Sequence, residues 1–143
     1  MVGLIDGSLS TLAPIFGIVF YTHHPHAAFV AGLSTSIGAA ISMAFSEGLS
    51  DTGELTGRGN PMLRGSITGV GTFLGGILHT LPFLITNYHA AVIAAVIVVA
   101  FELLALAVLR WRFFETSFVR SLLAVSIGGA VIAVVGALIG STA

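Results

Sequence analysis

The stretch AAFVAGLSTSIGAAISMAFS, residues 27–46, contains no charged residue, and residues 121–143 contain none either. An α-helix of about 20 apolar residues crosses the hydrocarbon core of a lipid bilayer. The chain of 143 residues is 56% hydrophobic and 8% charged, whereas soluble domains carry roughly 25% charged residues. The sequence therefore predicts one all-α integral membrane domain over residues 1–143, embedded in a lipid bilayer.

The basic residues lie between the apolar stretches in clusters of alternating type. In chain order these clusters are His23, His24 and His26, then Arg58 and Arg64, then His79 and His89, then Arg110, Arg112 and Arg120. A chain that crosses a membrane repeatedly would place all the Arg on one side and all the His on the other. Because basic residues concentrate in cytoplasmic loops, we expect the Arg clusters in the cytoplasm.

Five transmembrane helices account for this alternation and place the N-terminus in the cytoplasm. We expect these helices at about 4–22, 27–49, 65–86, 90–110 and 120–141. The apolar N-terminus carries Asp6 and no basic leader, so we expect a first transmembrane helix there rather than a cleaved signal peptide. Small residues recur four positions apart in the third and fifth helices, which predicts close helix packing at Gly65 with Gly69, Gly71 with Gly75, and Gly136 with Gly140.

The composition excludes several classes of function. A net charge of −1 argues against a nucleic-acid partner, which would require a basic surface. The chain has no Lys for a Schiff base or a phosphate loop, and no Cys for a thiolate metal site. No nucleophile–base pair or cofactor motif is present in the sequence. We therefore expect a protein that is not an enzyme and holds no permanently bound cofactor.

Three acidic residues lie within the apolar stretches: Asp6, Glu47 and Glu102. A charged side chain at the centre of a transmembrane helix costs roughly 2.5–3.5 kcal/mol on insertion scales, so such residues are usually functional. Asp6 near the start of the first helix and Glu47 near the end of the second would lie at similar depth, because these helices run antiparallel. Paired carboxylates without a basic residue in their own helices indicate a cation site. The alternatives are an acid favoured by the helix dipole at Asp6 and an interfacial acid that reaches water at Glu47.

Two further groups favour a transition metal at that site. Pro14 has no N–H to donate to the carbonyl of Ser10, so that oxygen is free to point at an ion. Met43 lies one helical turn before Glu47 and supplies a thioether, a soft ligand that suits transition metals better than Mg²⁺ or Ca²⁺. Met43 is equally explained as a flexible side chain that fills apolar space.

The remaining polar residues allow more than one interpretation. Glu102 lies about two helical turns before Arg110, and a proton relay and a contact with a hydroxyl on a neighbouring helix explain it equally well. The cluster of His23, His24 and His26 could bind a metal, because imidazole suits Fe²⁺, Mn²⁺ and Zn²⁺. It could also sense pH, or be no more than an exposed loop.

The order of these motifs resembles the vacuolar iron transporter family, five-helix exporters of Fe²⁺ and Mn²⁺. The resemblance covers nearly the whole chain, and the segments that carry it are DGSLST at 6–11, AAISMAFSE at 39–47, NPMLRG at 60–65, GGIL at 75–78 before PF at 82–83, and RS at 120–121 leading to SIGG at 126–129. It implies a homodimer in which the first two helices of both subunits line the translocation path. Asp6 then matches the first-helix carboxylate of the family, Met43 the second-helix thioether and Glu47 the acid at the cytoplasmic mouth. Fe²⁺ or Mn²⁺ would be the transported substrate, exchanged for protons.

Two features depart from the pattern of that family. Many members insert an acidic metal-collecting module between the second and third helices, whereas here residues 50–64 span the gap with Asp51 and Glu54 as the only acids. Metal capture would then be weaker, supplied by a ferritin-like or other partner, or absent. His79 stands where the family often has a proline. It is either an exit ligand on the non-cytoplasmic side, like the His cluster at 23–26, or a residue that caps a polar contact.

The sequence thus predicts a proton-coupled exporter of divalent transition metals in a prokaryotic inner membrane. Its path would contain Asp6, Ser10, Met43 and Glu47, and Glu102 is a candidate either for a proton relay or for a polar contact between helices. The alternative is a non-transporting structural or accessory subunit of a larger membrane complex, which has kept the transporter fold and lost the activity. The missing metal-collecting module favours this alternative, since a fold does not by itself carry a function.

Overall fold

The computed structural model describes residues 1–54, 56–113 and 117–143, which form α-helices, one short 3-10 helix and no strand. The elements are α1 (Val2–Ser10), α2 (Leu12–Thr22), α3 (Pro25–Gly48), α4 (Pro61–Leu78), η1 (Leu81–Leu84), α5 (Tyr88–Phe113) and α6 (Phe118–Thr142). The prediction of an all-α fold is confirmed.

Local sequence signals set where several helices begin. Asn60 caps α4, because its side chain accepts hydrogen bonds from the backbone N–H groups of Met62 and Leu63. Proline occupies the first position of both α3 and α4, where a missing N–H costs nothing. The turn between α2 and α3 is tight because His23 adopts a left-handed conformation with φ of 55°.

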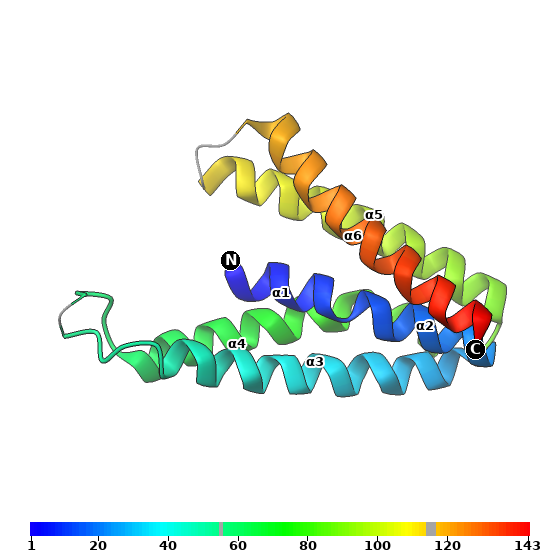
Figure 1. Cartoon of the computed structure of the whole chain (residues 1–143), viewed down its shortest axis with the longest axis horizontal. Coiled ribbons are helices and arrows are strands. Elements are labelled where there is room, and N and C mark those ends of the chain that lie inside the picture. Colours follow the sequence, from blue (N-terminus) through cyan, green and yellow to red (C-terminus); the bar gives the residue numbers. More distant parts are fainter. Residues whose placement is uncertain (55, 114–116) are drawn as a thin grey trace.

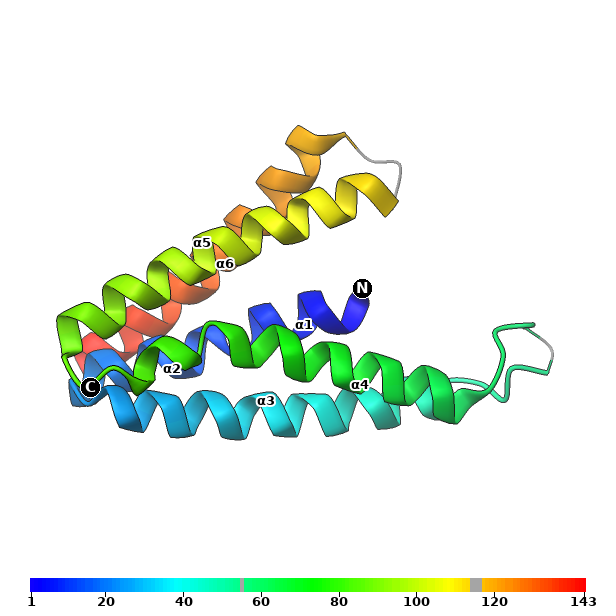
Figure 2. The ribbon, with the colours of Figure 1, turned by 180° about the vertical axis from the view of Figure 1, so that it is seen from behind.

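The helices form three layers. Figure 1 shows α3 and α4 side by side, α1 and α2 lying against them, and the α5–α6 hairpin beyond. In both views the α5–α6 hairpin lies close to α2 at one end of the molecule and diverges from the α3–α4 hairpin toward the other end (Figures 1 and 2). Helix α1 packs mainly on α4, and α2 packs mainly on α6 and α3. The first two helices therefore lie at the centre of the bundle.

Among the described residues, four helical segments are long and apolar enough to cross a membrane: Val2–Thr22, Pro25–Gly48, Tyr88–Phe113 and Phe118–Thr142. They make the chain compatible with an integral membrane protein, and they correspond to four of the five predicted helices. The remaining predicted helix, the third in chain order at 65–86, is not one continuous helix. Helix α4 ends at Leu78, and η1 follows after a two-residue turn. Pro82 lacks the N–H that a continuous α-helix would need at its position.

The first predicted span, residues 4–22, is also interrupted. Helix α1 ends at Ser10 and α2 begins at Leu12, with Thr11 alone between them at φ −88° and ψ −17°. Pro14 has no N–H for the Ser10 carbonyl, and proline is the commonest cause of a sharp helix kink. The interruption lies in the middle of the bundle and faces the buried polar residues described below.

Small residues bring the helix backbones together, as the sequence predicts. A Cβ atom on Gly65 would collide with the carbonyl oxygen of Ala44 in α3, and a Cβ atom on Gly136 would collide with the backbone of Ala13 in α2. Such rows of small residues are the usual means of close helix approach in a membrane. Here they place α4 against α3 and α6 against α2, and Gly7 in the same way places α1 against Thr72 of α4.

Candidate functional site

A buried group of polar side chains joins α1, α4 and α5 at the interruption of the first span. Glu102, from the middle of α5, accepts a hydrogen bond of 2.6 Å at Oε1 from the Ser8 hydroxyl of α1. Its Oε2 lies 2.7 Å from Nδ1 of His79, the C-cap residue that follows α4. The other ring nitrogen of His79, Nε2, is hydrogen-bonded to the hydroxyl of Thr11. We call Ser8, Thr11, His79 and Glu102 the polar core.

The polar core is almost completely shielded from solvent. The side chain of His79 has an exposed fraction of 0% and that of Glu102 has 10%, and Ser8 and Thr11 are buried as well. Burying a carboxylate costs a great deal of free energy unless it is paired and hydrogen-bonded. Both carboxylate oxygens of Glu102 have partners, and within the described part of the chain no buried side-chain nitrogen or oxygen lacks one.

Each member of the polar core is held by the helix that carries it. The Ser8 hydroxyl also contacts the carbonyl of Leu4 at 2.8 Å, and the Thr11 hydroxyl contacts the carbonyl of Gly7 at 2.9 Å. His79 is placed by the end of α4, immediately before the turn into η1. The arrangement is chemically an acid and an imidazole in direct contact, flanked by two hydroxyls. Groups of this kind bind and release protons.

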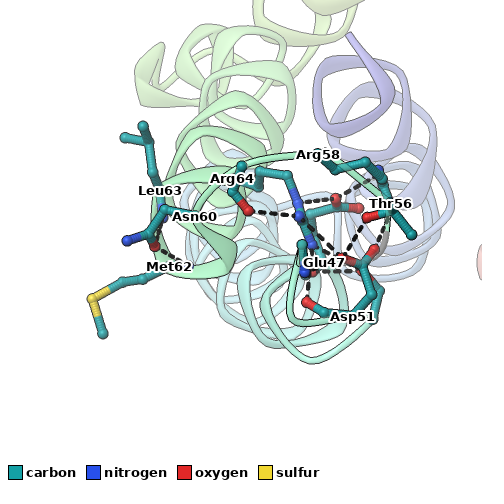
Figure 3. Close-up of polar contacts among 11 residues, drawn as sticks. Glu47, Asp51, Thr56, Arg58, Asn60, Met62, Leu63 and Arg64 are labelled. Carbon is teal, nitrogen blue, oxygen red and sulfur yellow. Dashed lines mark hydrogen bonds and ion pairs between the residues drawn. The ribbon is translucent and has the colours of Figure 1, made fainter.

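A second polar cluster lies in the connection between α3 and α4, and Figure 3 shows its side chains pointing toward one another. Glu47 accepts from Arg58 at 2.8 Å and from Arg64 at 3.1 Å, while Asp51 accepts from the same two residues at 3.0 and 3.4 Å. Arg64 also donates to the carbonyls of Gly59 and Asp51. We call Glu47, Asp51, Arg58 and Arg64 the loop cluster. It ties the connection between the two helices to the end of α3.

The pKa of Asp51 lies below its usual value of 3.8. Desolvation raises this pKa, but it is outweighed by hydrogen bonds from the Thr56 hydroxyl and the Gly53 N–H, by the charge of Arg64 and by a hydrogen bond from Arg58. Asp51 is therefore ionised at neutral pH and completes the charge balance of the loop cluster.

No hydrogen bond or ion pair in the described part of the chain joins the residues expected to form the cation site. Asp6 is half-buried on α1 and makes no hydrogen bond or ion pair with any described residue, whereas Glu47 is bound by two Arg side chains. Met43 is half-buried on α3, and the Ser10 side chain is exposed. Asp6 and Glu47 are not joined by any hydrogen bond among the described residues. Nor do three His, Asp or Glu side chains in that part of the chain gather closely enough to hold a metal.

The predicted exit ligands have different surroundings. Both ring nitrogens of His79 are in hydrogen bonds, Nδ1 with Glu102 and Nε2 with Thr11. His23, His24 and His26 are exposed at the turn between α2 and α3. The His23 ring lies 5.0 Å from that of Tyr88, which places this turn beside the start of α5.

No family model, curated protein or solved structure matches this chain. The resemblance to the vacuolar iron transporter family therefore rests on the sequence motifs alone.

Sequence reasoning singled out His79 and Glu102 separately, and one of its two explanations for Glu102 was a contact with a hydroxyl on a neighbouring helix, which Ser8 supplies. It did not identify which hydroxyl this is, and it missed the partnership of Glu102 with His79 and the contact of His79 with Thr11. Glu102 and His79 lie 23 positions apart on different helices, and no spacing rule links them. Ser8 and Thr11 are ordinary polar residues in DGSLST, at an i, i+3 spacing that puts them on one helical face. Two features of the sequence could have indicated the polar core. One is the shared helical face of Ser8 and Thr11, and the other is the acid in the middle of an apolar helix, which requires a partner.

Proposed function

We propose that this chain is a transporter that moves a divalent transition metal, Fe²⁺ or Mn²⁺, out of the cytosol in exchange for protons. The observation that carries the proposal concerns Asp6, which is an acid within an apolar helical segment. Its side chain has no hydrogen-bond or ion-pair partner among the described residues. Ionisable residues inside transmembrane segments usually mark ion pathways. Asp6 lies about one turn before the interruption at Thr11, where the helix leaves backbone groups without helical partners.

The ligands would come from α1 and α3. The Asp6 carboxylate supplies a charged oxygen, the Ser10 carbonyl has no N–H donor in Pro14, and Met43 supplies a soft thioether. One chain offers too few of these groups to enclose an ion. A homodimer with α1 and α3 at its centre would double each of them, as the resemblance to the vacuolar iron transporters implies.

Glu47 has a different role in this proposal from the one its position in the sequence suggests. Two guanidinium groups balance its charge, and such a carboxylate attracts a metal weakly. We therefore assign Glu47 to the loop cluster, which braces the cytoplasmic mouth of the pathway. In the proposed topology α4 and η1 complete a fifth crossing, and the N-terminus lies in the cytoplasm of a prokaryotic cell.

Transport by purified protein in liposomes tests the proposal. Fe²⁺ or Mn²⁺ is added outside, and a metal-sensitive and a pH-sensitive dye are trapped inside. We expect metal entry with a proton signal for the wild type and a loss of at least tenfold for Asp6→Asn. Glu54→Gln is the matched control, because Glu54 is an exposed acid of the loop, and it should transport normally. Equal rates for Asp6→Asn and the wild type would refute the role of Asp6.

The accessory-subunit alternative is favoured by one specific observation. Glu47 forms ion pairs with Arg58 and Arg64. Within residues 1–54, 56–113 and 117–143, no three His, Asp or Glu side chains come close enough together to hold a metal ion. A folded wild-type protein that moves no metal, but stays associated with an unrelated membrane protein through purification in mild detergent, would establish this alternative. Under it, Met43→Leu would leave both stability and association unchanged.

A further inference from the structure

We propose that Glu102 and His79 form a proton-binding site. The number of protons that the pair holds determines whether the Ser8 and Thr11 hydroxyls donate to the backbone carbonyls of α1, close to Asp6. The proton site itself stands on the geometry of the polar core. Its link to metal movement rests on the proposed function.

The polar core is one continuous chain of contacts. It runs from the Leu4 carbonyl to the Ser8 hydroxyl and Glu102 Oε1, then from Glu102 Oε2 to His79 Nδ1. From His79 Nε2 it continues to the Thr11 hydroxyl and ends at the carbonyl of Gly7. Both ends of the chain are backbone carbonyls of α1, and the acid and the imidazole lie between them.

The number of hydrogens that this chain requires depends on the protonation of Glu102 and His79. Five contacts need five hydrogens, and carbonyl oxygens supply none. Each hydroxyl supplies one, so three must come from the pair. The pair supplies three only when Glu102 is a carboxylic acid and His79 is an imidazolium. With one proton fewer, one of the five contacts loses its hydrogen bond, and with two fewer a second one does.

The contacts that are lost lie on α1. An ionised Glu102 takes the single hydrogen of Ser8, which then no longer donates to the Leu4 carbonyl. When His79 is neutral and donates from Nδ1 to Glu102, its Nε2 must accept a hydrogen bond. The Thr11 hydroxyl then donates its single hydrogen to Nε2 and no longer donates to the Gly7 carbonyl. Ser and Thr hydroxyls that bond to the carbonyl four residues earlier bend helices. Proton release therefore turns both hydroxyls from the α1 backbone to the pair and alters the bend at Thr11.

Few other charges can take over this role. On the elements packed around the pair, α1 carries Asp6 and the Met1 amine, α2 carries the exposed Tyr21, and α6 carries the exposed Arg120. Apart from the pair itself, the titratable residues of α3, α4 and α5 lie toward the helix ends: His26, Glu47, Arg64, Tyr88, His89, Arg110 and Arg112. His23 and His24 lie in the turn between α2 and α3, and Asp51, Glu54 and Arg58 lie in the connection between α3 and α4. Asp6 is the titratable group nearest to the polar core along the chain, two residues from Ser8. A cation at Asp6 and protons on the pair would thus act on the same short helix.

Infrared difference spectroscopy across a pH series, on protein in lipid nanodiscs, detects the proton directly. We expect a carboxylic-acid C=O band that appears as the pH falls, is lost in Glu102→Gln, and shifts its midpoint in His79→Gln. Ser8→Ala should keep the band and move its frequency, because the carboxyl group loses one partner. Ser36→Ala is the matched control, since in the described part of the chain its buried hydroxyl bonds to no group except the Gly32 carbonyl of its own helix, and its band should match the wild type.

The outcomes separate this proposal from the proposed function. A band that persists in Glu102→Gln, or that is insensitive to Ser8→Ala in folded protein, overturns the proton site whatever the transport data show. In liposomes we expect Glu102→Gln to lose the proton signal while metal still enters down its gradient. If the wild-type protein shows the titrating band but no metal entry, the result would support the proton site and refute the proposed transport function.

Discussion

At the level of single residues, the two Arg side chains of the loop cluster should contribute very differently to stability. The Arg64 side chain has an exposed fraction of 14% and contacts both acids as well as backbone carbonyls, whereas that of Arg58 has 50%. Removing one partner of a shielded charged network leaves the others without compensation and costs about 2–3 kcal/mol. An exposed ion pair contributes about 0–1 kcal/mol.

We therefore expect Arg64→Gln to lower the thermal stability of the protein in detergent clearly, and Arg58→Gln to lower it little. Thermal unfolding of the two variants under identical conditions is the measurement. Equal losses would mean that the loop cluster does not depend on burial. Both variants keep Asp6 and the polar core, so a change in metal transport without a change in stability would assign the loop cluster a direct role at the mouth.

At the level of elements, long apolar runs with few charges made α3, α5 and α6 predictable. Their predicted ranges 27–49, 90–110 and 120–141 each match one observed helix, because hydrophobic content over about 20 residues is a strong signal. The range 65–86 was less accurate, since a single proline and a buried His end α4 earlier than hydropathy suggests. The sequence predicted that the Ser10 carbonyl lacks an N–H donor in Pro14, but it did not predict that the helix is interrupted at Thr11.

The candidate site divides in the same way. Glu102 and His79 stood out because each is a polar residue in apolar sequence, and so both could be found. Their contact depends on how α4 and α5 pack, which no local pattern specifies. The partners of Glu47 come from a loop of twelve residues between α3 and α4, Leu49–Asn60, and from the first turn of α4. Their geometry depends on turns that composition does not reveal.

The interruption between α1 and α2 leads to a prediction about Pro14. Replacing Pro14 with Ala restores an N–H to the Ser10 carbonyl and favours one continuous helix. Pro14 lies in the first turn of α2, where proline costs far less than in a helix interior, and proline also restricts the unfolded chain, so we expect Pro14→Ala to change the stability of the protein by less than about 1 kcal/mol. Transport should fall, because the straightened helix moves Thr11 relative to His79. Thermal unfolding and liposome transport measure the two effects. A variant that is equally active would show that the bend is not needed.

At the level of the whole molecule, the proposed pathway is incomplete in one copy of the chain. Asp6 and Met43 lie on α1 and α3, and the described residues of one chain do not gather three acidic or imidazole ligands. If two copies share one site, a defect in one copy disables both. Closed symmetric dimers are the commonest assemblies of identical chains, and random pairing of equal amounts of two variants leaves about one quarter of the dimers fully wild type.

Co-expression of wild-type and Asp6→Asn chains in equal amounts, with different tags, therefore distinguishes a shared site from two independent ones. We expect the mixed preparation to transport metal at about one quarter of the wild-type rate, because a dimer with one Asp6 lacks a charged ligand. Independent pathways would give about one half, since every wild-type chain would remain active. Glu54→Gln in place of Asp6→Asn should restore the full rate and controls for expression. A rate of one half would retain Asp6 as a ligand but require each chain to complete its own site.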